Sequence, residues 1–240
     1  MKIDIVIPVY NESHVLEQKI RELSAFLNRH CGEEWEILIV DNASTDDTFH
    51  EMQKLSSELP RVKALHLDRK GRGRALRFAW SNSESDIVCY MDVDLSTELS
   101  AFPEMIEAFK NGADVVVGSR LKRGAKIKRC LLREFLSRGY NIFHRMLLQT
   151  HFTDAQCGFK GFTRKAIQEL LPISRSVKWF LDTELLILSE RLGFKIFEIP
   201  VTWIEDPDTR VNIFKAVVED IRGLLRMRWM FWFRQCKQWR

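Results

Sequence analysis

Short apolar runs and helix-like repeats alternate along the first half of the chain. In the first helical pattern, Leu16, Ile20, Leu23 and Leu27 are spaced four, three and four residues apart, which places them on one face of a helix. The predicted strands cover residues 3–7, 36–40, 62–67, 86–91 and 113–117, and the predicted helices cover 16–27, 49–59, 74–80 and 102–109. This order predicts an α/β fold in which a mostly parallel central sheet carries helices on both faces.

The pattern changes near residue 120. We predict a basic helix over about 127–148, a loop over 154–159, a helix that contains 179–184, a strand near 195–199 and a last helix from 212 to about 233. The sequence has no internal repeat and no long linker, so we expect one domain over residues 1–211, with halves at about 1–120 and 121–211. Residues 212–240 form the predicted C-terminal amphipathic helix.

Polar side chains follow four of the predicted strands. They are Tyr10, Asn11 and Glu12 after the first strand, Asp41 and Asn42 after the second, Asp92 and Asp94 after the fourth, and Ser119 and Arg120 after the fifth. Ligands of open parallel sheets bind beyond the carboxyl ends of the strands. Four loops at one sheet edge therefore predict a nucleotide site.

Asp92 and Asp94 are the sharpest local feature of that edge. Two carboxylates on alternate residues directly after a buried strand are costly unless something neutralises them. A hard divalent cation does so, and Mg²⁺ or Mn²⁺ binds through one or two carboxylates together with substrate phosphates. The pair therefore predicts a metal site, although Asp-x-Asp alone is also common in surface turns.

The composition fits a folded protein of this class. The 240 residues are 45% hydrophobic and 29% charged, which supports a packed core. The five cysteines include no Cys-x-x-Cys pair, which disfavours a disulfide framework and a structural zinc site. No stretch without a charged residue exceeds eight residues, and the N-terminal apolar run contains Asp4 and ends at Pro8. We therefore expect neither a membrane span nor a signal peptide, and a cytoplasmic location.

Positive charge is concentrated in two stretches. Residues 120–145 contain nine Lys or Arg and one acid, and residues 221–240 contain six Lys or Arg and no acid. Such stretches attract phosphorylated substrates, anionic lipid surfaces or nucleic acid, and a solvated basic face is the alternative. Nucleic acid is disfavoured, because the first stretch lacks a known reader motif and holds few aromatic residues. In the second, Trp229, Trp232 and Trp239 alternate with arginines, which indicates a lipid interface or, alternatively, packing on the domain core.

A set of motifs runs in order along nearly the whole chain. It comprises Ile7-Pro8-Val9-Tyr10-Asn11-Glu12, Val40-Asp41-Asn42-Ala43-Ser44, Lys70-Gly71-Arg72-Gly73, Tyr90-Met91-Asp92-Val93-Asp94, Gly118-Ser119-Arg120, Arg133-x-x-x-Ser137 and Asp154-x-Gln156-Cys157-Gly158-Phe159. In these motifs the chain resembles family 2 glycosyltransferases of GT-A fold. It is most similar to the dolichyl- or polyprenyl-phosphate mannose and glucose synthases. The resemblance implies transfer of a hexose from a nucleotide sugar of GDP-mannose or UDP-glucose type to a lipid phosphate.

The resemblance also implies roles for individual residues. Pro8, Tyr10 and Glu12 would line the nucleotide pocket, Asp41 would bind the base, and Lys70, Gly71, Gly73 and Arg210 would lie along the nucleotide and its diphosphate. Asp92 and Asp94 would hold the donor diphosphate through Mg²⁺ or Mn²⁺, and Arg120, Arg133 and Ser137 would bind the acceptor phosphate. Asn42 stands where the family commonly has a second acid, and Ser96 and Thr97 replace a frequent glutamine-type residue near the metal, so donor base and metal geometry stay open.

The charge of the acceptor decides how much base catalysis is needed. A hydroxyl acceptor requires a general base, whereas a phosphomonoester with a second pKa near 6 is already largely ionised. The many arginines favour the phosphate, and Asp154 and Asp182 stay candidates for a base or an orienting acid. The alternative is a glycosyltransferase of the same fold that acts on a saccharide or glycolipid hydroxyl. Further expected partners are the cytoplasmic face of a membrane and a membrane-anchoring subunit.

Overall fold

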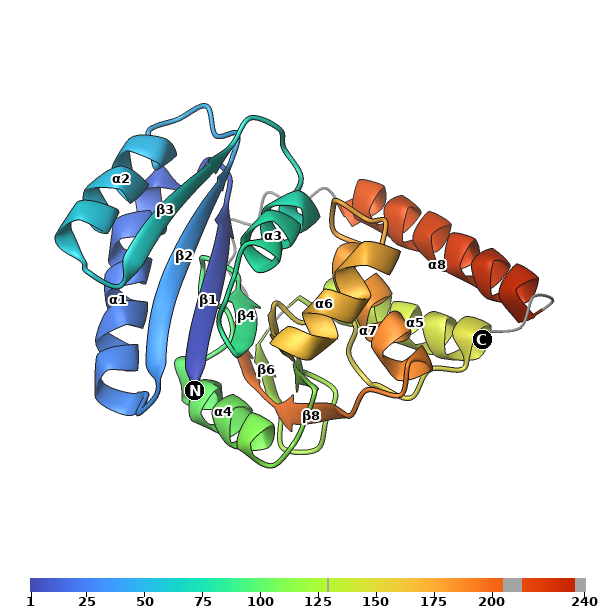
Figure 1. The fold of residues 1–240 in the computed structure, drawn as a ribbon. Coiled ribbons are helices and arrows are strands. Elements are labelled where there is room, and N and C mark those ends of the chain that lie inside the picture. The colour runs from blue at the N-terminus through green and yellow to red at the C-terminus, as the bar shows by residue number, and fades with distance from the viewer. Residues whose placement is uncertain (129, 205–212, 236–240) are drawn as a thin grey trace.

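A seven-stranded sheet forms the centre of the molecule in a computed structural model of the chain, which describes residues 1–128, 130–204 and 213–235 (Figure 1). Its strand order is β3-β2-β1-β4-β7-β5-β8, and β6 and β9 pair in a separate small sheet. The strands are β1 (Lys2–Val9), β2 (Glu34–Asn42), β3 (Val62–Leu67), β4 (Ile87–Met91), β5 (Val115–Ser119), β6 (Lys126–Lys128), β7 (Phe159–Thr163), β8 (Ile196–Pro200) and β9 (Thr202–Ile204).

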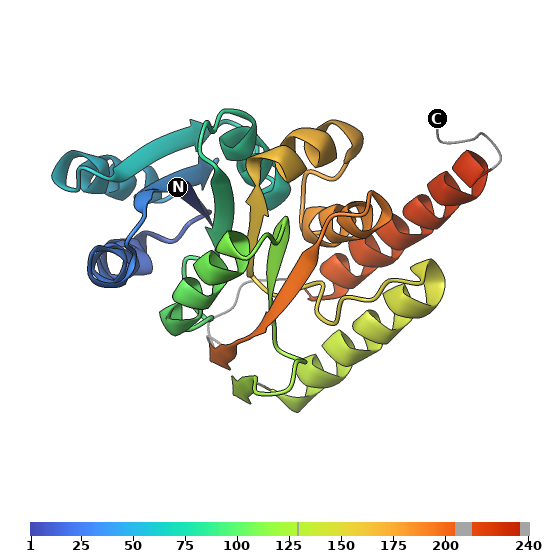
Figure 2. The same cartoon turned by 60° about the horizontal axis from the view of Figure 1, so that its bottom comes forward.

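Helices cover both faces of this sheet, as the sequence predicts (Figure 2). Residues of α1, α2 and α4 pack on one face, and residues of α3, α6, α7 and α8 pack on the other. The helices are α1 (Ser13–His30), α2 (Thr48–Glu58), α3 (Arg72–Ser81), α4 (Phe102–Lys110), α5 (Leu131–Leu148), α6 (Arg164–Ile173), α7 (Leu181–Arg191) and α8 (Ile213–Gln235), and a 3₁₀ turn, Leu99–Ala101, precedes α4.

The continuous apolar runs of the central strands result from this double covering. In β1, Ile3, Ile5 and Ile7 belong to the core under α1 and α2, and Val6 belongs to the core on the opposite face. Side chains alternate between the faces of a strand, so a strand that is buried on both faces needs apolar residues at nearly every position. The five strands predicted in the first half are all present, with ends that differ by at most two residues.

β7 is the main departure from the expected alternation. It begins at Phe159, where a loop is predicted, and runs antiparallel between β4 and β5, with Lys160 opposite both Tyr90 and Val117. The second half of the chain therefore supplies a strand to the middle of the sheet that the first half builds. Gly161 in β7 lies against Phe109, so a larger residue there would collide with α4.

The basic stretch after residue 120 is only partly helical. Lys126–Lys128 pair with β9 as strand β6, and helix α5 begins at Leu131 rather than near 127. Helix α6, in which Pro172 lies inside the last turn, was not among the predicted elements.

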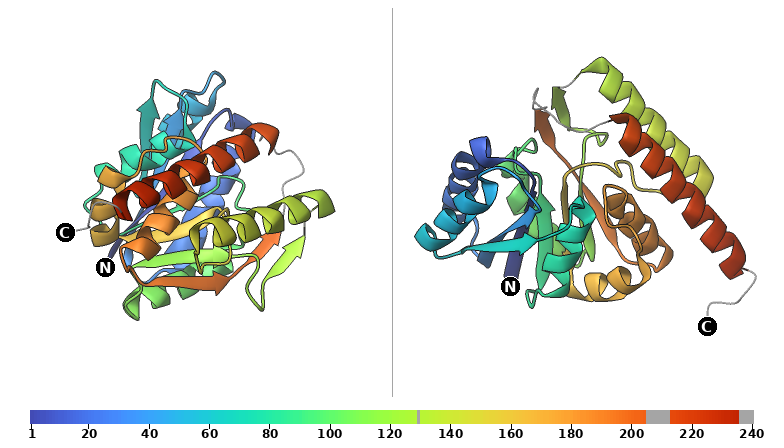
Figure 3. Two further views of the ribbon diagram at one scale, coloured as in Figure 1. Left: turned by 90° about the vertical axis from the view of Figure 1, so that its right-hand side faces the viewer. Right: turned by 90° about the horizontal axis from the view of Figure 1, so that it is seen from above.

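At the end of the molecule away from β3, α5 and α8 run side by side (Figure 3). Helix α8 confirms the predicted C-terminal helix over its described residues, and residues 212 and 236–240 lie outside them. Within the described part of the chain, no helix combines the length and apolar character that crossing a membrane requires. Both helices expose large apolar residues.

Candidate active site

The loops after β1, β2 and β3 meet at the edge of the sheet where the polar motifs were expected. β1 and β2 pair in parallel with Val9 opposite Asp41, which brings their ends together. The loops are tied by Asn11, whose backbone N–H donates to Ser44 Oγ (2.9 Å) and whose Oδ1 accepts the backbone N–H of Thr45 (2.8 Å). Lys70 Nζ lies 3.2 Å from the centre of the Tyr10 ring, so these two predicted nucleotide-binding residues are in contact.

Pro8, Glu12 and Asp41 lie at the same edge. Pro8 is in β1 and half-buried, and the backbone N–H of Glu12 donates to Thr48 Oγ1 (2.8 Å) at the start of α2. Asp41 is fully buried, with Oδ2 at 2.7 Å from His66 Nδ1 and Oδ1 accepting the Ser44 backbone N–H (3.1 Å). Both oxygens of the predicted base-binding residue are thus engaged within the protein.

The glycine loop before α3 is held from two sides. The Gly71 N–H donates to Asn42 Oδ1 at 2.7 Å, which gives a structural role to the amide that replaces the family's commoner acid. A Cβ on Gly71 would lie 2.5 Å from the Val177 carbonyl oxygen, and one on Gly73 would lie 2.5 Å from that of Lys178. Glycine at both positions therefore allows the loop to pack directly on the backbone of the segment before α7.

Arg72 connects the predicted metal-binding acid with the predicted acid of α7. Its Nη2 donates to Asp92 Oδ1 and its Nη1 to Asp182 Oδ2, each at 3.0 Å. The guanidinium lies 4.7 Å from the ring centres of both Tyr90 and Trp179, and the residue is 8% exposed. Sequence reasoning missed this residue because it treated the motif as two glycines along a nucleotide. A charged residue between two glycines was the available signal.

Asp92 and Asp94 follow β4 on the same turn. Gly158 lies directly against Asp92: a Cβ there would be 1.8 Å from Asp92 Oδ2, so the carboxylate can occupy its position only opposite a glycine. Asp94 accepts hydrogen bonds from the backbone N–H (2.9 Å) and hydroxyl (2.6 Å) of Ser96, a residue of the motif that departs from the family pattern.

The two carboxylates fit a hard divalent cation that takes its other ligands from a diphosphate and water. Within residues 1–128, 130–204 and 213–235, no group of three or more His, Cys, Asp and Glu side chains is arranged to hold a metal ion. A pair of acids that is completed by substrate oxygens is the kind of site that Mg²⁺ commonly uses.

Asp182 is the centre of a buried polar network. Its Oδ2 accepts from Arg72, from the Tyr90 hydroxyl and, at 3.5 Å, from Lys160 Nζ. Lys160 is fully buried and also donates to the carbonyl oxygen of Cys157 at 2.6 Å. Burial acts to raise the pKa of Asp182, but the charges of Arg72 and Lys160 outweigh it and leave that pKa below its ordinary value.

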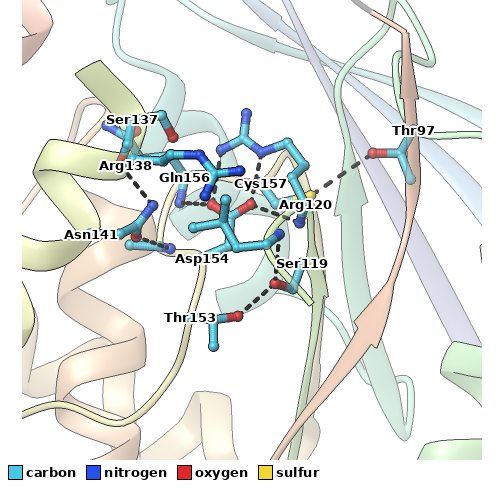
Figure 4. Close-up of polar contacts among 12 residues, drawn as sticks. Thr97, Ser119, Arg120, Ser137, Arg138, Asn141, Thr153, Asp154, Gln156 and Cys157 are labelled. Carbon is cyan, nitrogen blue, oxygen red and sulfur yellow. Dashed lines mark hydrogen bonds and ion pairs between the residues drawn. The ribbon is translucent and has the colours of Figure 1, made fainter. Parts of the chain in front are cut away.

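Arg120 and Asp154 form a closed pair (Figure 4). Arg120 Nε and Nη2 donate to Asp154 Oδ2 (2.7 Å) and Oδ1 (2.8 Å), and its backbone N–H donates to Oδ2 (3.0 Å). Burial acts to raise the pKa of Asp154, but the charge and hydrogen bonds of Arg120 lower it to about 2. Asp154 is fully buried, so it holds Arg120 rather than facing solvent.

Ser137 lies on α5 and is drawn in the same close-up as this pair (Figure 4). Its Oγ is buried and has no hydrogen-bond partner in the described part of the chain, and its carbonyl accepts from Asn141 Nδ2 at 2.9 Å. Asn141 Oδ1 in turn accepts the Ala155 N–H (3.0 Å), which ties α5 to the loop after Asp154. Arg133 lies one turn before Ser137 in α5, but its side chain lies outside the described part, as does the whole of Arg210.

The structure thus brings the predicted residues together in two clusters. The first contains Tyr10, Lys70 and the glycine loop with Asp92 and Asp182, and the second contains Arg120, Asp154 and Ser137. Tyr90 and Lys160, which sequence reasoning did not assign, link Asp182 to Cys157 in the loop that follows Asp154.

Comparison with known sequences identifies relatives along most of the chain. Residues 4–171 match the family Glycosyl transferase family 2. Glycosyltransferase AglD of Haloferax volcanii is 32% identical over 240 residues, covering 98% of this chain and 38% of AglD. Dolichyl-phosphate beta-glucosyltransferase ALG5C of Trichomonas vaginalis is 31% identical (87% of this chain, 65% of the relative). Dolichol-phosphate mannosyltransferase of Pyrococcus furiosus is 30% identical (95% and 64%). The chain therefore spans between 38% and 65% of the length of these three relatives.

Solved structures with the same fold include glucosyl-3-phosphoglycerate synthase from Mycobacterium tuberculosis in complex with UDP. The TM-score is 0.72 at 21% identity, covering 95% of this chain and 80% of that one. A second structure of that enzyme contains Mn²⁺, UDP and glucosyl-3-phosphoglycerate, with a TM-score of 0.70 at 20% identity over 95% of this chain and 79% of that one. At such identity the likeness shows the GT-A fold and leaves the substrate to other evidence.

Proposed function

Because the chain belongs to glycosyl transferase family 2, we propose that it is an inverting hexosyltransferase that acts on a polyprenyl or dolichyl phosphate at a membrane surface. The names of two of its relatives support this acceptor: one is a dolichyl-phosphate glucosyltransferase and the other a dolichol-phosphate mannosyltransferase. The donor is a nucleotide sugar of the UDP-glucose or GDP-mannose type, and the difference between these two relatives leaves both open. The chain spans only part of each relative, so the proposal concerns the transfer step alone.

The state of the two candidate bases is the observation that carries the choice of acceptor. Asp154 has a pKa of about 2 because Arg120 outweighs burial, and Asp182 has a lowered pKa because Arg72 and Lys160 outweigh burial. A carboxylate with a lowered pKa is a poor proton acceptor at neutral pH. A hydroxyl acceptor would need such a base, whereas a phosphate monoester, with a second pKa near 6, attacks as an anion. Positioning and charge screening then suffice.

Residues of the first cluster are proposed to hold the donor. Tyr10, which follows β1, and Lys70, which lies between β3 and α3, contact each other and would lie along the nucleotide. Asp92 and Asp94 would hold Mg²⁺ or Mn²⁺, which supplies positive charge to the leaving diphosphate when it is bound. The glycine loop keeps its backbone close to Asn42 and to the segment before α7, which fixes the position of the loop beside Asp92.

Residues of the second cluster are proposed to hold the acceptor phosphate. Asp154 binds the guanidinium of Arg120 through two atoms and so fixes its direction, while Ser137 keeps a buried hydroxyl without a partner in the described part of the chain. Arg133 lies on the same helix one turn from Ser137. Arginine and hydroxyl groups are suitable donors to phosphate oxygens, because a charged acceptor strengthens each hydrogen bond.

The membrane contact is proposed for one side of α5 and α8. Helix α8 exposes Ile221, Leu225, Trp229 and Trp232, which are spaced four, four and three residues apart on one face. Helix α5 beside it exposes Phe135, Ile142 and Met146. We define these seven residues as the apolar face. Arginines flank its aromatic residues, with the Arg228 guanidinium 5.9 Å from the Trp232 ring, an arrangement that suits an anionic headgroup layer. We propose that this layer belongs to the cytoplasmic face of a membrane.

Product analysis tests the transfer. The purified chain is incubated with a panel of nucleotide sugars, Mg²⁺ or Mn²⁺ and either polyprenyl phosphate or the corresponding polyprenol, and the lipid products are identified by mass spectrometry. We expect a polyprenyl-phosphate hexose from one donor and no product from polyprenol. Transfer to a saccharide or glycolipid hydroxyl, with none to the lipid phosphate, would instead support the alternative acceptor.

Vesicle flotation tests the membrane contact with the purified chain alone. We expect binding to vesicles that contain anionic lipid and weaker binding to zwitterionic vesicles or after Trp229→Ser with Trp232→Ser. Phe49→Ser, which removes an exposed aromatic ring on α2, is the matched control and should leave flotation unchanged. If the chain floats only after another membrane protein is added, the predicted anchoring subunit is required.

A further inference from the structure

Arg72 has no role in the proposed transfer, although its side chain contacts two carboxylates and two aromatic rings. Its two terminal nitrogens donate to different carboxylates, Asp92 and Asp182, at 3.0 Å each. The rings of Tyr90 and Trp179 lie on its guanidinium at 4.7 Å each. A lysine would offer a single point of charge, so this arrangement needs the planar fork of arginine.

The backbone at Arg72 is fixed on both sides. Gly71 donates to Asn42 Oδ1, and the backbone N–H of Arg74 donates to the Val177 carbonyl oxygen at 2.9 Å. The glycines on either side of Arg72 touch the backbone at Val177 and Lys178. The backbone that carries the guanidinium is therefore held in place, and the two carboxylates and two rings hold the guanidinium itself.

The positive charge of Arg72 lies next to the carboxylate that would bind the proposed cation. The guanidinium lies against Asp92 Oδ1, one of the oxygens that the proposed function gives to a divalent metal. A positive charge at this position repels a bare cation. It attracts the complex of the same cation with a nucleoside diphosphate, because that complex carries net negative charge.

Two atoms of this network have no hydrogen-bond partner in the described residues. They are Arg72 Nε and Asp182 Oδ1, and both are buried. Buried polar atoms without a partner are costly, so this donor and this acceptor are groups that water or a bound ligand would satisfy.

We propose that Arg72 is a positioning residue that engages one oxygen of Asp92 and restricts the Asp92–Asp94 site to a divalent cation that is carried by a diphosphate. Asp182 holds Arg72 in this position from the other side. The inference rests on the proposed function only in taking Asp92 as a metal ligand; it does not depend on the sugar or the acceptor. The binding of cation and diphosphate is then cooperative, and free Mn²⁺ binds weakly.

Binding of Mn²⁺ to the full chain tests this proposal without any turnover. Free Mn²⁺ is measured by electron paramagnetic resonance with no nucleotide, with UDP and with GDP. For the wild type we expect weak binding of Mn²⁺ alone and at least about tenfold tighter binding with one of the nucleotides. For Arg72→Gln we expect at least about threefold tighter binding of Mn²⁺ alone, because the repelling charge is gone, and a smaller gain from nucleotide.

Three further variants separate this role from a structural one. Arg72→Lys keeps the charge and should keep weak binding of Mn²⁺ alone. Arg72→Gln with Asp182→Asn removes one charge of each sign, so it restores the charge balance of the network if the single variant unfolds. Arg77→Gln removes side-chain hydrogen bonds from α3 to Leu171 and Ser174 without touching either carboxylate, and should match the wild type in all Mn²⁺ titrations.

Two outcomes would overturn the proposal. One is that folded Arg72→Gln, or the double variant, binds Mn²⁺ alone no more tightly than the wild type, which would make Arg72 a purely structural residue. The other is that the wild type binds Mn²⁺ equally well with and without either nucleotide. Failure of the proposed function is distinguishable, because absence of lipid product leaves these titrations unaffected.

Discussion

Two buried arginines, Arg72 and Arg120, are held in opposite ways. Nε and Nη2 of Arg120 both donate to one carboxylate, that of Asp154, so each carboxylate oxygen is bound within the pair. Arg72 divides its nitrogens between Asp92 and Asp182 and keeps a buried Nε without a partner in the described chain. The pair of Arg120 and Asp154 holds two loops in place. Arg72 contacts two carboxylates, so a change at one of them alters the surroundings of the other. Loss of Arg120 should therefore lower stability in addition to its proposed effect on the acceptor phosphate, whereas loss of Arg72 should mainly change binding.

Breaking the closed pair should have the largest effect on folding. Arg120→Ala leaves Asp154 buried and charged without its partner, and we expect the free energy of unfolding to fall by about 3–5 kcal/mol. Urea denaturation followed by circular dichroism measures this. Arg120→Met with Asp154→Leu should recover much of the loss, because no charge then stays buried. An Arg120→Ala protein as stable as the wild type would contradict the assignment of a closed pair.

Breaking the shared arrangement at Asp92 should instead reduce activity. Asp92→Asn removes a proposed metal ligand while keeping the size of the side chain, and we expect the transfer rate to fall by at least about 100-fold. The midpoint of thermal unfolding should change little, because Asp92 is partly exposed and Asp182 still holds Arg72. Asp94→Asn and a chelator should reduce the rate similarly. Full activity in the presence of chelator would contradict metal dependence.

A third buried carboxylate, that of Asp220, should change the free energy of unfolding with pH in the opposite direction to Asp154. Asp220 on α8 accepts a hydrogen bond from Gln156 Nε2 at 2.9 Å, and burial raises its pKa to about 7 because it lacks the arginine that lowers the pKa of Asp154. The folded state therefore holds a proton that the unfolded state releases above about pH 4. Its contribution to stability is present below pH 4 and is lost as pH rises through about 7.

The Asp220→Asn variant tests whether Asp220 lowers the free energy of unfolding as pH rises. The variant should be more stable than the wild type by at least about 1 kcal/mol at pH 8, and the difference should disappear near pH 4. Asp154 has the opposite sign, because its folded pKa of about 2 makes it stabilising above pH 4 and less so as pH falls through 2. Urea unfolding at pH 2, 4, 6 and 8 distinguishes the two, because Asp154 acts between pH 2 and 4 and Asp220 between pH 4 and 8. A difference between Asp220→Asn and wild type that does not vary with pH would count against a raised pKa.

The smallest expected effect concerns the hydroxyl of Ser137. Ser137→Ala should raise the KM for the lipid phosphate by about 2- to 10-fold, the value of one hydrogen bond, and leave the KM for the donor unchanged. Stability should not fall, since the Oγ makes no hydrogen bond in the described residues. Ser57→Ala on the exposed side of α2 is the control. An equal rise in both KM values would place Ser137 outside the acceptor site.

The sequence allowed prediction of the parts of this molecule that depend on local patterns. The strands β1, β2, β4 and β5 are visible as apolar runs because each is largely buried on both faces, and Asp92 is conspicuous because it directly follows such a run. Strand β7 was not visible, because Phe159-Lys160-Gly161-Phe162-Thr163 contains a lysine that would ordinarily be exposed. Its burial depends on Tyr90 and Asp182, which are distant in the chain.

Partners at long range also limited the prediction of the site. Asp154 was a candidate base from its place in a motif, but its role follows from Arg120, 34 residues earlier. Arg72 could be seen as part of a motif, yet its two carboxylates lie 20 and 110 residues further on. Local spacing identifies which residues have functional chemistry. Which of them neutralise one another depends on the folded arrangement.

The course of the chain from Asp154 to Phe159 has a practical consequence for changing substrate preference. Within these six residues it passes from the partner of Arg120 to Gly158, which adjoins Asp92, and then enters the sheet as β7. Any insertion or bulky replacement here would disturb the proposed donor and acceptor sites together. Libraries aimed at a new lipid should therefore leave this segment intact and vary exposed positions of α5, where selection for one substrate need not compromise the other.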